Sequence, residues 1–192
     1  MSSAFEVVAL AASAGGLNAL THVLAALPED FPAALVVVQH LDPRHRSLLA
    51  DILSRRAVLS VKEAADGDEL RPGCAYIGPP NHHLLVNPDR SISLTQTQLV
   101  HFVRPSADLL FESTAASFKE RAIAVVLSGS GSDGVMGVKA IKKMGGTVIV
   151  QDPKNAEFAG MPESVQATGL ADFVLTLDEI APALRRLCTA ND

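Results

Sequence analysis

Near-continuous apolar runs, each followed by a polar or small-residue turn and then a helical pattern, constrain the fold of this chain most strongly. The first run spans Phe5 to Ala12, the second Ala34 to Gln39, and another Ala122 to Leu127. Such runs are typical of parallel strands buried on both faces. Leucines at helical spacing follow the first run between residues 16 and 27. This alternation predicts an α/β fold with a doubly wound, mainly parallel, Rossmann-like sheet.

The other regular elements follow from the same periodicity. Ser106 is a suitable N-cap for a helix, and Gly145 or Gly146 a suitable end for another. Further helices are expected at 47–56, 106–119, 135–144, 162–167 and 178–188, and further strands at 147–151 and 172–175.

The middle of the chain breaks this alternation. Short apolar stretches at 58–63, 74–77, 84–86 and 91–94 are separated by Gly, Pro and Asn-Pro-Asp turns. Short strands joined by such turns are typical of antiparallel pairing. We therefore expect a small antiparallel β insertion between two α/β halves.

Composition limits the class of protein. With 192 residues, 48% of them hydrophobic and 19% charged, the chain is expected to form one globular domain. The net charge of −5 without a basic stripe argues against nucleic-acid binding. Cys74 and Cys188 have neither metal-ligand spacing nor a disulfide framework, which fits a reducing cytosol. We found no signal peptide and no apolar stretch of the ~18 residues that a membrane span needs, so we expect a cytoplasmic protein without membrane insertion.

Three polar residues lie at or just beyond the ends of apolar runs: Ser13, His40 and Asp133. Because parallel strands present their carboxyl ends along one edge of a sheet, these residues are expected to converge there. Serine, histidine and aspartate are the groups of an acyl-transfer triad, in which the hydroxyl attacks, the imidazole moves the proton and the carboxylate orients the imidazole. Taken singly, each has a simpler explanation: Ser13 as a helix cap or phosphate contact, His40 as a structural residue, and Asp133 as the cap of the helix that follows it.

Other motifs are weaker. His45 is a rival base, His82 and His83 are expected to border the site, and His22 is expected to be structural. Ala11-x-Ser13-x-Gly15 is similar to a nucleophile elbow, but the order Ser, His, Asp differs from that of ordinary α/β-hydrolases. There is no dinucleotide fingerprint and no P-loop lysine, and the SGSGSDG loop has a single carboxylate, so no metal is expected.

The chain resembles the catalytic domain of the chemotaxis protein-glutamate methylesterases (CheB type). The resemblance is carried by blocks in one order along nearly the whole chain: Ala12-Ser13-Ala14-Gly15-Gly16, Val38-Gln39-His40-Leu41-Asp42-Pro43, Asp66-Gly67, Pro72-Gly73-x-Ala75-Tyr76-Ile77, Arg104-Pro105-Ser106-x-Asp108-x-Leu110-Phe111, Leu127-Ser128-Gly129-x-Gly131-x-Asp133-Gly134 and Phe158-x-Gly160-Met161-Pro162.

This resemblance implies a function and a site. The family's nucleophile, base and acid correspond to Ser13, His40 and Asp133, and the backbone amides near Ala14 and Ser130 are its implied oxyanion donors. The implied reaction is hydrolysis of γ-glutamyl methyl esters on the cytoplasmic helices of chemoreceptors, releasing methanol without a cofactor, and in some members deamidation of receptor glutamines.

Several features depart from the family pattern. Ala11, Ala14 and Ser130 stand where other residues are usual, which affects the turn and the oxyanion site. Residues 1–190 correspond to the catalytic domain alone, so the usual N-terminal receiver domain is expected to be absent. The chain is then either a standalone esterase or a domain taken from a longer protein, and a receiver or methyltransferase partner, covalent or separate, stays open. The alternative function is a catalytically weak module that binds partners in a chemosensory or two-component system.

Overall fold

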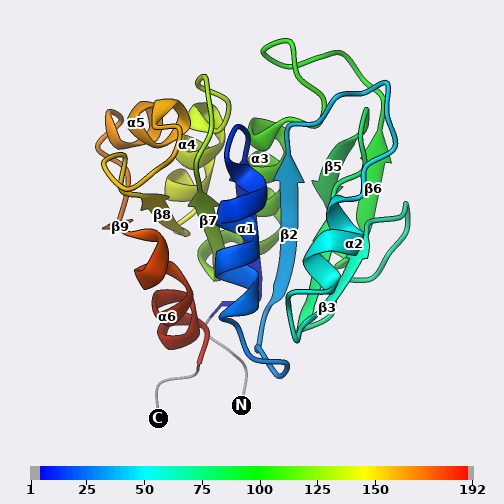
Figure 1. Ribbon diagram of the computed structural model, residues 1–192, viewed down its shortest axis with the longest axis horizontal. Coiled ribbons are helices and arrows are strands. Elements are labelled where there is room, and N and C mark those ends of the chain that lie inside the picture. Colours follow the sequence, from blue (N-terminus) through cyan, green and yellow to red (C-terminus); the bar gives the residue numbers. More distant parts are fainter. Residues whose placement is uncertain (1–4, 190–192) are drawn as a thin grey trace.

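The computed structural model, which describes residues 5–189, is built on a seven-stranded parallel sheet (Figure 1). Its centre is formed by β1 (Val7–Ala12), flanked by β2 (Ala34–Gln39) and β7 (Ala122–Val126). The strand order is β3-β4-β2-β1-β7-β8-β9, and every pairing in this sheet is parallel. The outer strands are β3 (Ser60–Glu63), β4 (Cys74–Ile77), β8 (Thr147–Gln151) and β9 (Phe173–Leu175). The predicted Rossmann-like α/β architecture is therefore confirmed.

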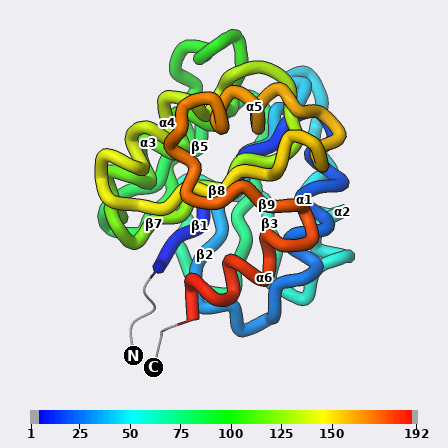
Figure 2. The backbone as a smooth tube through the Cα atoms, turned by 90° about the vertical axis from the view of Figure 1, so that its left-hand side faces the viewer, coloured from blue at the N-terminus to red at the C-terminus, as the bar shows by residue number. Residues whose placement is uncertain are grey.

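Helices cover both faces of the sheet, and an edge-on view separates the two layers (Figure 2). Alternate residues of β1 point to opposite faces, so Val8 and Leu10 belong to one apolar core and Val7 and Ala9 to the other. The first face carries α1 (Gly16–Ala25), α2 (Leu49–Ser54) and α6 (Leu177–Cys188). The second carries α3 (Ala107–Phe118), α4 (Val135–Lys143) and α5 (Gly160–Gln166), with the 3₁₀ turn Lys119–Arg121 after α3.

The predicted β insertion is only partly correct. Strands β5 (His83–Val86) and β6 (Ile92–Thr95) do form a separate antiparallel pair. The segment 74–77, however, is β4 and pairs in parallel with β2 and β3, so it belongs to the main sheet. The strand expected at 58–63 begins at Ser60 and also joins that sheet. Both errors arise because local turn signals do not tell which distant strand will supply the hydrogen bonds.

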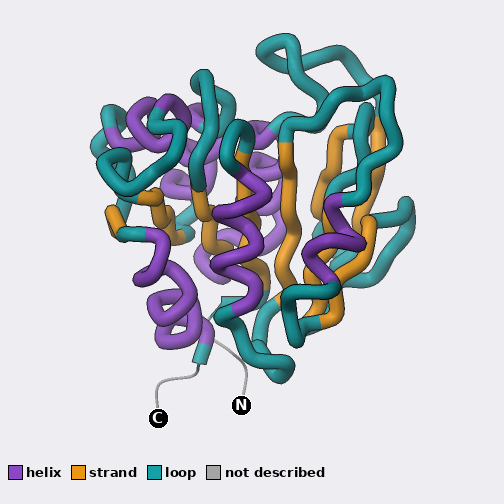
Figure 3. Tube along the Cα trace, viewed as in Figure 1, coloured by secondary structure: helices purple, strands orange, loops and turns teal. Residues whose placement is uncertain are grey.

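The order of the central strands indicates where on the sheet a ligand-binding site would lie. From β1 the chain moves through α1 to β2 on one side, whereas β7 lies on the other side. Loops that follow these strands gather at the upper end of the sheet (Figure 3). Open α/β sheets bind ligands at such a switch point, beyond the carboxyl ends of the strands.

Two further expectations concern the extent of the chain. The predicted catalytic domain, residues 1–190, includes residues 1–4 and 190, which lie outside the described residues. Within residues 5–189, every helix is too short or too polar to cross a bilayer.

Candidate functional site

Ser13 lies in a tight turn between β1 and α1. Its carbonyl accepts a hydrogen bond from the Gly16 amide at 2.8 Å, and Gly15 has a φ of 73°. These features are typical of a type II turn, whose third residue favours glycine. A side chain at Gly15 would also clash, since its Cβ would lie 2.7 Å from Ser128 Oγ. The Gly15 turn therefore ends the strand sharply and leaves Ser13 half-buried at the sheet edge.

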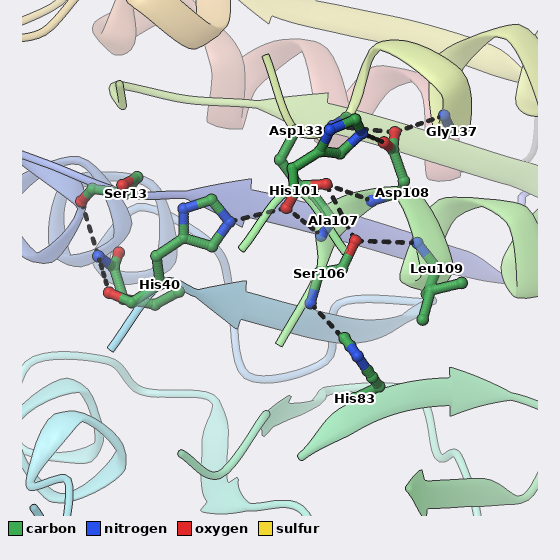
Figure 4. Close-up of polar contacts among 12 residues, drawn as sticks. Ser13, His40, His83, His101, Ser106, Ala107, Asp108, Leu109, Asp133 and Gly137 are labelled. Atoms are coloured by element: carbon green, nitrogen blue, oxygen red, sulfur yellow. Dashed lines mark hydrogen bonds and ion pairs between the residues drawn. The ribbon is translucent and has the colours of Figure 1, made fainter. Parts of the chain in front are cut away.

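His40 is the neighbour of Ser13 across the β1–β2 pair. Ala12 is paired with Gln39 in register, and the His40 amide donates to the Ala12 carbonyl at 3.2 Å. One residue further along each strand, Ser13 and His40 stand next to each other. Figure 4 displays Ser13, His40 and Asp133 in that order across the site. The structure thus places Ser13 beside His40 in the strand register, while the catalytic roles of the three residues stay a prediction.

The His40 ring is held by Asp133. His40 Nε2 lies 2.7 Å from Asp133 Oδ2, and the two side chains are 14% and 4% exposed. Because a carboxylate only accepts, Nε2 carries the proton and Nδ1 is left as the basic nitrogen. In chymotrypsin-like proteases the aspartate bonds Nδ1 of the histidine and the serine bonds Nε2, so the two ring nitrogens are exchanged here. Ser13 Oγ makes no hydrogen bond to any residue between 5 and 189, so the nucleophile–base contact is not closed in this state.

Asp133 is fixed by the start of α3. Its carboxylate accepts hydrogen bonds from the Ala107 amide at 2.6 Å, the Asp108 amide at 3.0 Å and the Ser106 hydroxyl at 3.0 Å. Ser106 is also the N-cap of α3, as expected. The simpler explanation of Asp133, that it caps the helix directly after it, is wrong: its carboxylate accepts no hydrogen bond from an amide of α4 and instead accepts those of Ala107 and Asp108 at the start of α3.

The start of α4 is capped in return from α3. Asp108, in the first turn of α3, accepts hydrogen bonds from the Gly134 amide at 2.9 Å and the Gly137 amide at 2.7 Å. Its other oxygen lies 3.2 Å from His101 Nε2. The two helices thus exchange carboxylates at their N-termini, where negative charge is stabilised. This exchange, visible in Figure 4, holds Asp133 rigidly relative to the sheet.

The two carboxyl groups are shifted in opposite directions. Burial raises the pKa of Asp133, but hydrogen bonds from His40 and from the Ala107 and Asp108 amides outweigh it, so the pKa lies below its usual value. Burial, together with the charge of Asp133, holds the pKa of Asp108 above its usual value despite the Gly137 and Gly134 amides. Asp133 therefore stays anionic at neutral pH, as a group that orients an imidazole must.

Some backbone amides near Ser13 are already occupied. The Ser13 amide donates to the Ser128 carbonyl, and the Gly129 amide donates to the Phe158 carbonyl, both at 3.0 Å. In contrast, the amides of Ala14 and Ser130, the two predicted oxyanion candidates, donate to no acceptor within residues 5–189. They are available to a developing negative charge.

In the described part of the chain, the side chains of the other histidines bond neither Ser13 nor His40. His45 is exposed and paired with Asp42 at 3.4 Å, so it is not placed as a base. His83 borders the site as expected: its Nδ1 accepts from the Ser106 amide at 3.2 Å and its Nε2 donates to the Gln98 carbonyl at 2.9 Å. Among residues 5–189, the His82 side chain bonds only the Pro80 carbonyl of its own loop, and His22 is in an exposed pair with Asp178.

Sequence analysis missed the supporting residues. In the sequence, Asp108 and His101 carry no individual signal, and Gln39 is only the end of an apolar run, although a polar residue that closes a buried strand is a clue. Gln39 Nε2 donates to the Ser13 carbonyl, and Ser128 Oγ to the Ala14 carbonyl. No group of three or more His, Cys, Asp or Glu side chains suited to a metal occurs in residues 5–189.

Comparison with known families identifies similar proteins over nearly the whole chain. A family model described as CheB methylesterase matches residues 8–184. A Leptospira interrogans protein named "Putative protein-glutamate methylesterase/protein-glutamine glutaminase" is 39% identical, with 97% of each chain covered. A Moorella thermoacetica protein-glutamate methylesterase/protein-glutamine glutaminase is 43% identical over 96% of this chain, which spans only 44% of that protein.

A solved structure has the same fold. The crystal structure of the Thermotoga maritima CheB methylesterase catalytic domain aligns with a TM-score of 0.91 and 38% identity, covering 95% of this chain and 98% of that one. Both the architecture and the sequence therefore point to one family.

Proposed function

Because this chain belongs to the CheB methylesterase family of hydrolases, we propose that it hydrolyses γ-glutamyl methyl esters on chemoreceptor cytoplasmic domains, releasing glutamate and methanol. The observation that carries the proposal is the 2.7 Å contact between His40 Nε2 and Asp133, with Ser13 next to His40 in the strand register. These three residues are the proposed nucleophile, base and orienting acid.

The first half of the reaction is acyl transfer to Ser13. Ser13 Oγ attacks the ester carbonyl as its proton passes to His40 Nδ1. The carbonyl oxygen becomes an oxyanion that accepts hydrogen bonds from the Ala14 and Ser130 amides. Collapse of this intermediate breaks the bond to the methoxy group, which takes the proton from Nδ1 and leaves as methanol.

The second half returns the enzyme to its starting state. Water attacks the glutamyl–Ser13 ester, gives its proton to His40 Nδ1, and the Ser13 oxygen recovers that proton as glutamate is released. Asp133 remains anionic throughout and stabilises the imidazolium. Attack on the side-chain amide of a receptor glutamine would follow the same path and release ammonia, which is the proposed second activity.

The proposal includes the setting of this chemistry. The substrate is a methyl-accepting receptor or related signalling protein in the cytoplasm, and a receiver or methyltransferase, covalent or separate, is the proposed regulatory partner. The names of the Leptospira and Moorella relatives support the substrate class.

The decisive experiment combines turnover with labelling. Wild-type protein is incubated with a methylated receptor cytoplasmic domain, methanol is measured, and the residue modified by an aryl phosphonate is identified. We expect methanol release, labelling of Ser13, and loss of both in Ser13→Ala with unchanged thermal stability. Labelling at another residue would overturn the mechanism. Receptor binding without methanol release would instead favour the alternative, a partner-binding module.

A further inference from the structure

The carboxamide of Gln39 has a role that the proposed reaction steps do not yet include. Gln39 closes β2 beside His40 and is 8% exposed. Its Nε2 donates to the Ser13 carbonyl at 2.6 Å and to the His40 carbonyl at 3.3 Å. Its Oε1 is the one buried side-chain nitrogen or oxygen within residues 5–189 that has no hydrogen-bond partner. An unpartnered buried oxygen is costly, so stability alone does not explain an amide at this position.

The donor on Gln39 determines the direction of the next amide. In a trans peptide the carbonyl and the amide point in opposite directions. Because the Ser13 carbonyl is directed at Gln39 Nε2 and the Gly16 amide, the Ala14 N–H is directed away from both. That N–H is the proposed oxyanion donor, and its orientation is thus set by Gln39 Nε2 together with the Gly16 amide of the turn.

The following peptide is held from the opposite strand. Ser128, two residues after the end of β7, donates from Oγ to the Ala14 carbonyl at 2.8 Å and accepts from the Phe158 amide at 2.9 Å. Ser128 is itself 1% exposed, and its amide donates to Gln151 Oε1 at 2.9 Å. Buried side chains from the two strands that flank β1 therefore hold the two peptides that follow Ser13.

The helix start leaves room for the Gln39 amide. A Cβ placed on Gly16 would lie 1.8 Å from Gln39 Oε1 and 2.7 Å from its Cδ. The amide therefore packs directly against the backbone of the first residue of α1. Any side chain at position 16 would displace it, which gives the second glycine of the Gly15-Gly16 pair a physical reason.

We infer that Gln39 is a positioning residue that holds the Ser13 carbonyl so that the Ala14 amide is aligned with the oxyanion of the proposed ester hydrolysis. This inference rests on the proposed function. Since the oxyanion exists only after attack, misalignment of the amide weakens transition-state binding and leaves substrate binding unchanged. The consequence is a fall in kcat at constant KM.

Gln39→Met tests this inference, because methionine keeps the length of the side chain but removes both the Nε2 donor and the unpartnered oxygen. We expect kcat for methanol release from a methylated receptor domain to fall by about 10- to 100-fold, with KM within about two-fold. The melting temperature is expected to hold or rise. The rate of Ser13 labelling by the phosphonate, whose P–O⁻ occupies the oxyanion position, is expected to fall in parallel with kcat. Gln166→Met, at an exposed glutamine at the end of α5, is the matched control and should change none of these values.

The outcomes separate the two proposals. Wild-type kcat in Gln39→Met, or a joint change of KM, melting temperature and kcat, overturns the positioning role while leaving the methylesterase proposal intact. A wild-type protein that releases no methanol overturns both. If Gln39→Met does not fold, Gln39→Asn is measured in the same way, since its amide is one methylene short of the Ser13 carbonyl and is expected to lower kcat similarly.

Discussion

The two ends of the same parallel sheet use charge differently. At the amino end of β1, Glu6 pairs with Arg90 and Arg121, and both guanidinium groups also lie over the Phe118 ring, at 5.7 and 5.6 Å from its centre. These arginine side chains are 38% and 44% exposed. At the carboxyl end, Asp133 is 4% exposed and receives four hydrogen bonds from fixed donors.

The charged groups at the amino end therefore mainly stabilise the fold, whereas those at the carboxyl end fix the orientation of a side chain. An exposed ion pair is screened by water and salt, and its long side chains adjust when a partner is lost. A buried carboxylate cannot adjust, because each of its donors would be left unpaired without water to replace it. The amino end therefore contributes a modest stabilisation that tolerates change, whereas the carboxyl end holds one ring in one orientation.

Asp133→Ala should break the carboxyl end most completely. The buried amides of Ala107 and Asp108 lose their acceptor, and the His40 ring loses its orientation. We expect kcat for methanol release to fall by about 10⁴-fold and the free energy of unfolding to fall by about 3–5 kcal/mol. Turnover assays and chemical denaturation measure the two effects. The control Asp133→Asn keeps the shape of the side chain and should recover part of the stability and little of the activity. Near-wild-type turnover in either variant would contradict the proposed triad.

Acid should remove the stability advantage of Asp133. Its pKa is lowered in the folded state from the ordinary value of 3.8, so its contribution is fully present above that value and is lost as the pH falls through the folded-state pKa. The difference in free energy of unfolding between wild type and Asp133→Ala should therefore be constant from pH 7 to about 5 and shrink below about pH 4. Melting temperatures of both proteins across this range measure it; a gap that widened in acid would mean that the carboxyl group is not anionic in the fold.

Glu6→Gln is the matching test at the amino end. Loss of the charge should lower the free energy of unfolding by about 1 kcal/mol or less, because the pairs with Arg90 and Arg121 are partly exposed. The effect should diminish in about 1 M NaCl, where the Debye length is ~3 Å. Methanol release should be unchanged. A marked loss of turnover would show that the two ends are coupled.

The smallest effect is expected for a pair that is exposed on both sides. His22 and Asp178 join α1 to α6 with side chains 47% and 84% exposed. Removing the imidazole with His22→Ala should change the free energy of unfolding by about 0.5 kcal/mol or less. Chemical denaturation of this variant and of Glu6→Gln gives the change in the free energy of unfolding for each pair. Comparing the two changes shows whether the stabilisation depends on how buried a pair is.

The central sheet could be predicted from sequence because β1, β2 and β7 carry their signal locally. Each is an apolar run followed by a turn and a helical pattern. Such a run indicates a parallel strand whose two faces are covered by helices. The segment 74–77 has no such signal, since its glycine and proline turns suit a hairpin as well as a parallel strand. Its place beside β2 is decided by pairing with residues 40 positions earlier in the chain, such as Leu35 with Ala75.

The candidate site also contains residues that the sequence indicates and residues that only the packing of distant segments brings together. The positions of Ser13, His40 and Asp133 after strands limit where these residues can lie, so the sequence predicts that they gather at one edge of the sheet. Proximity in sequence favours α4 as the helix that Asp133 would cap, which is the simpler explanation weighed for this residue, whereas the observed bonds go to α3. Asp108 could not be assigned, because its partners Gly134 and Gly137 lie on another helix and only packing brings them together.

The exchange of carboxylates between α3 and α4 has a consequence for biosynthesis. A chain that has emerged from the ribosome only as far as α3 already contains Ser13 and His40, but the acid that orients the imidazole has not been made. Even when Asp133 follows, neither helix start is completed until the other has docked. Activity should therefore arise in one late step, and a half-made or partly unfolded molecule would be silent toward its substrate and not merely slow.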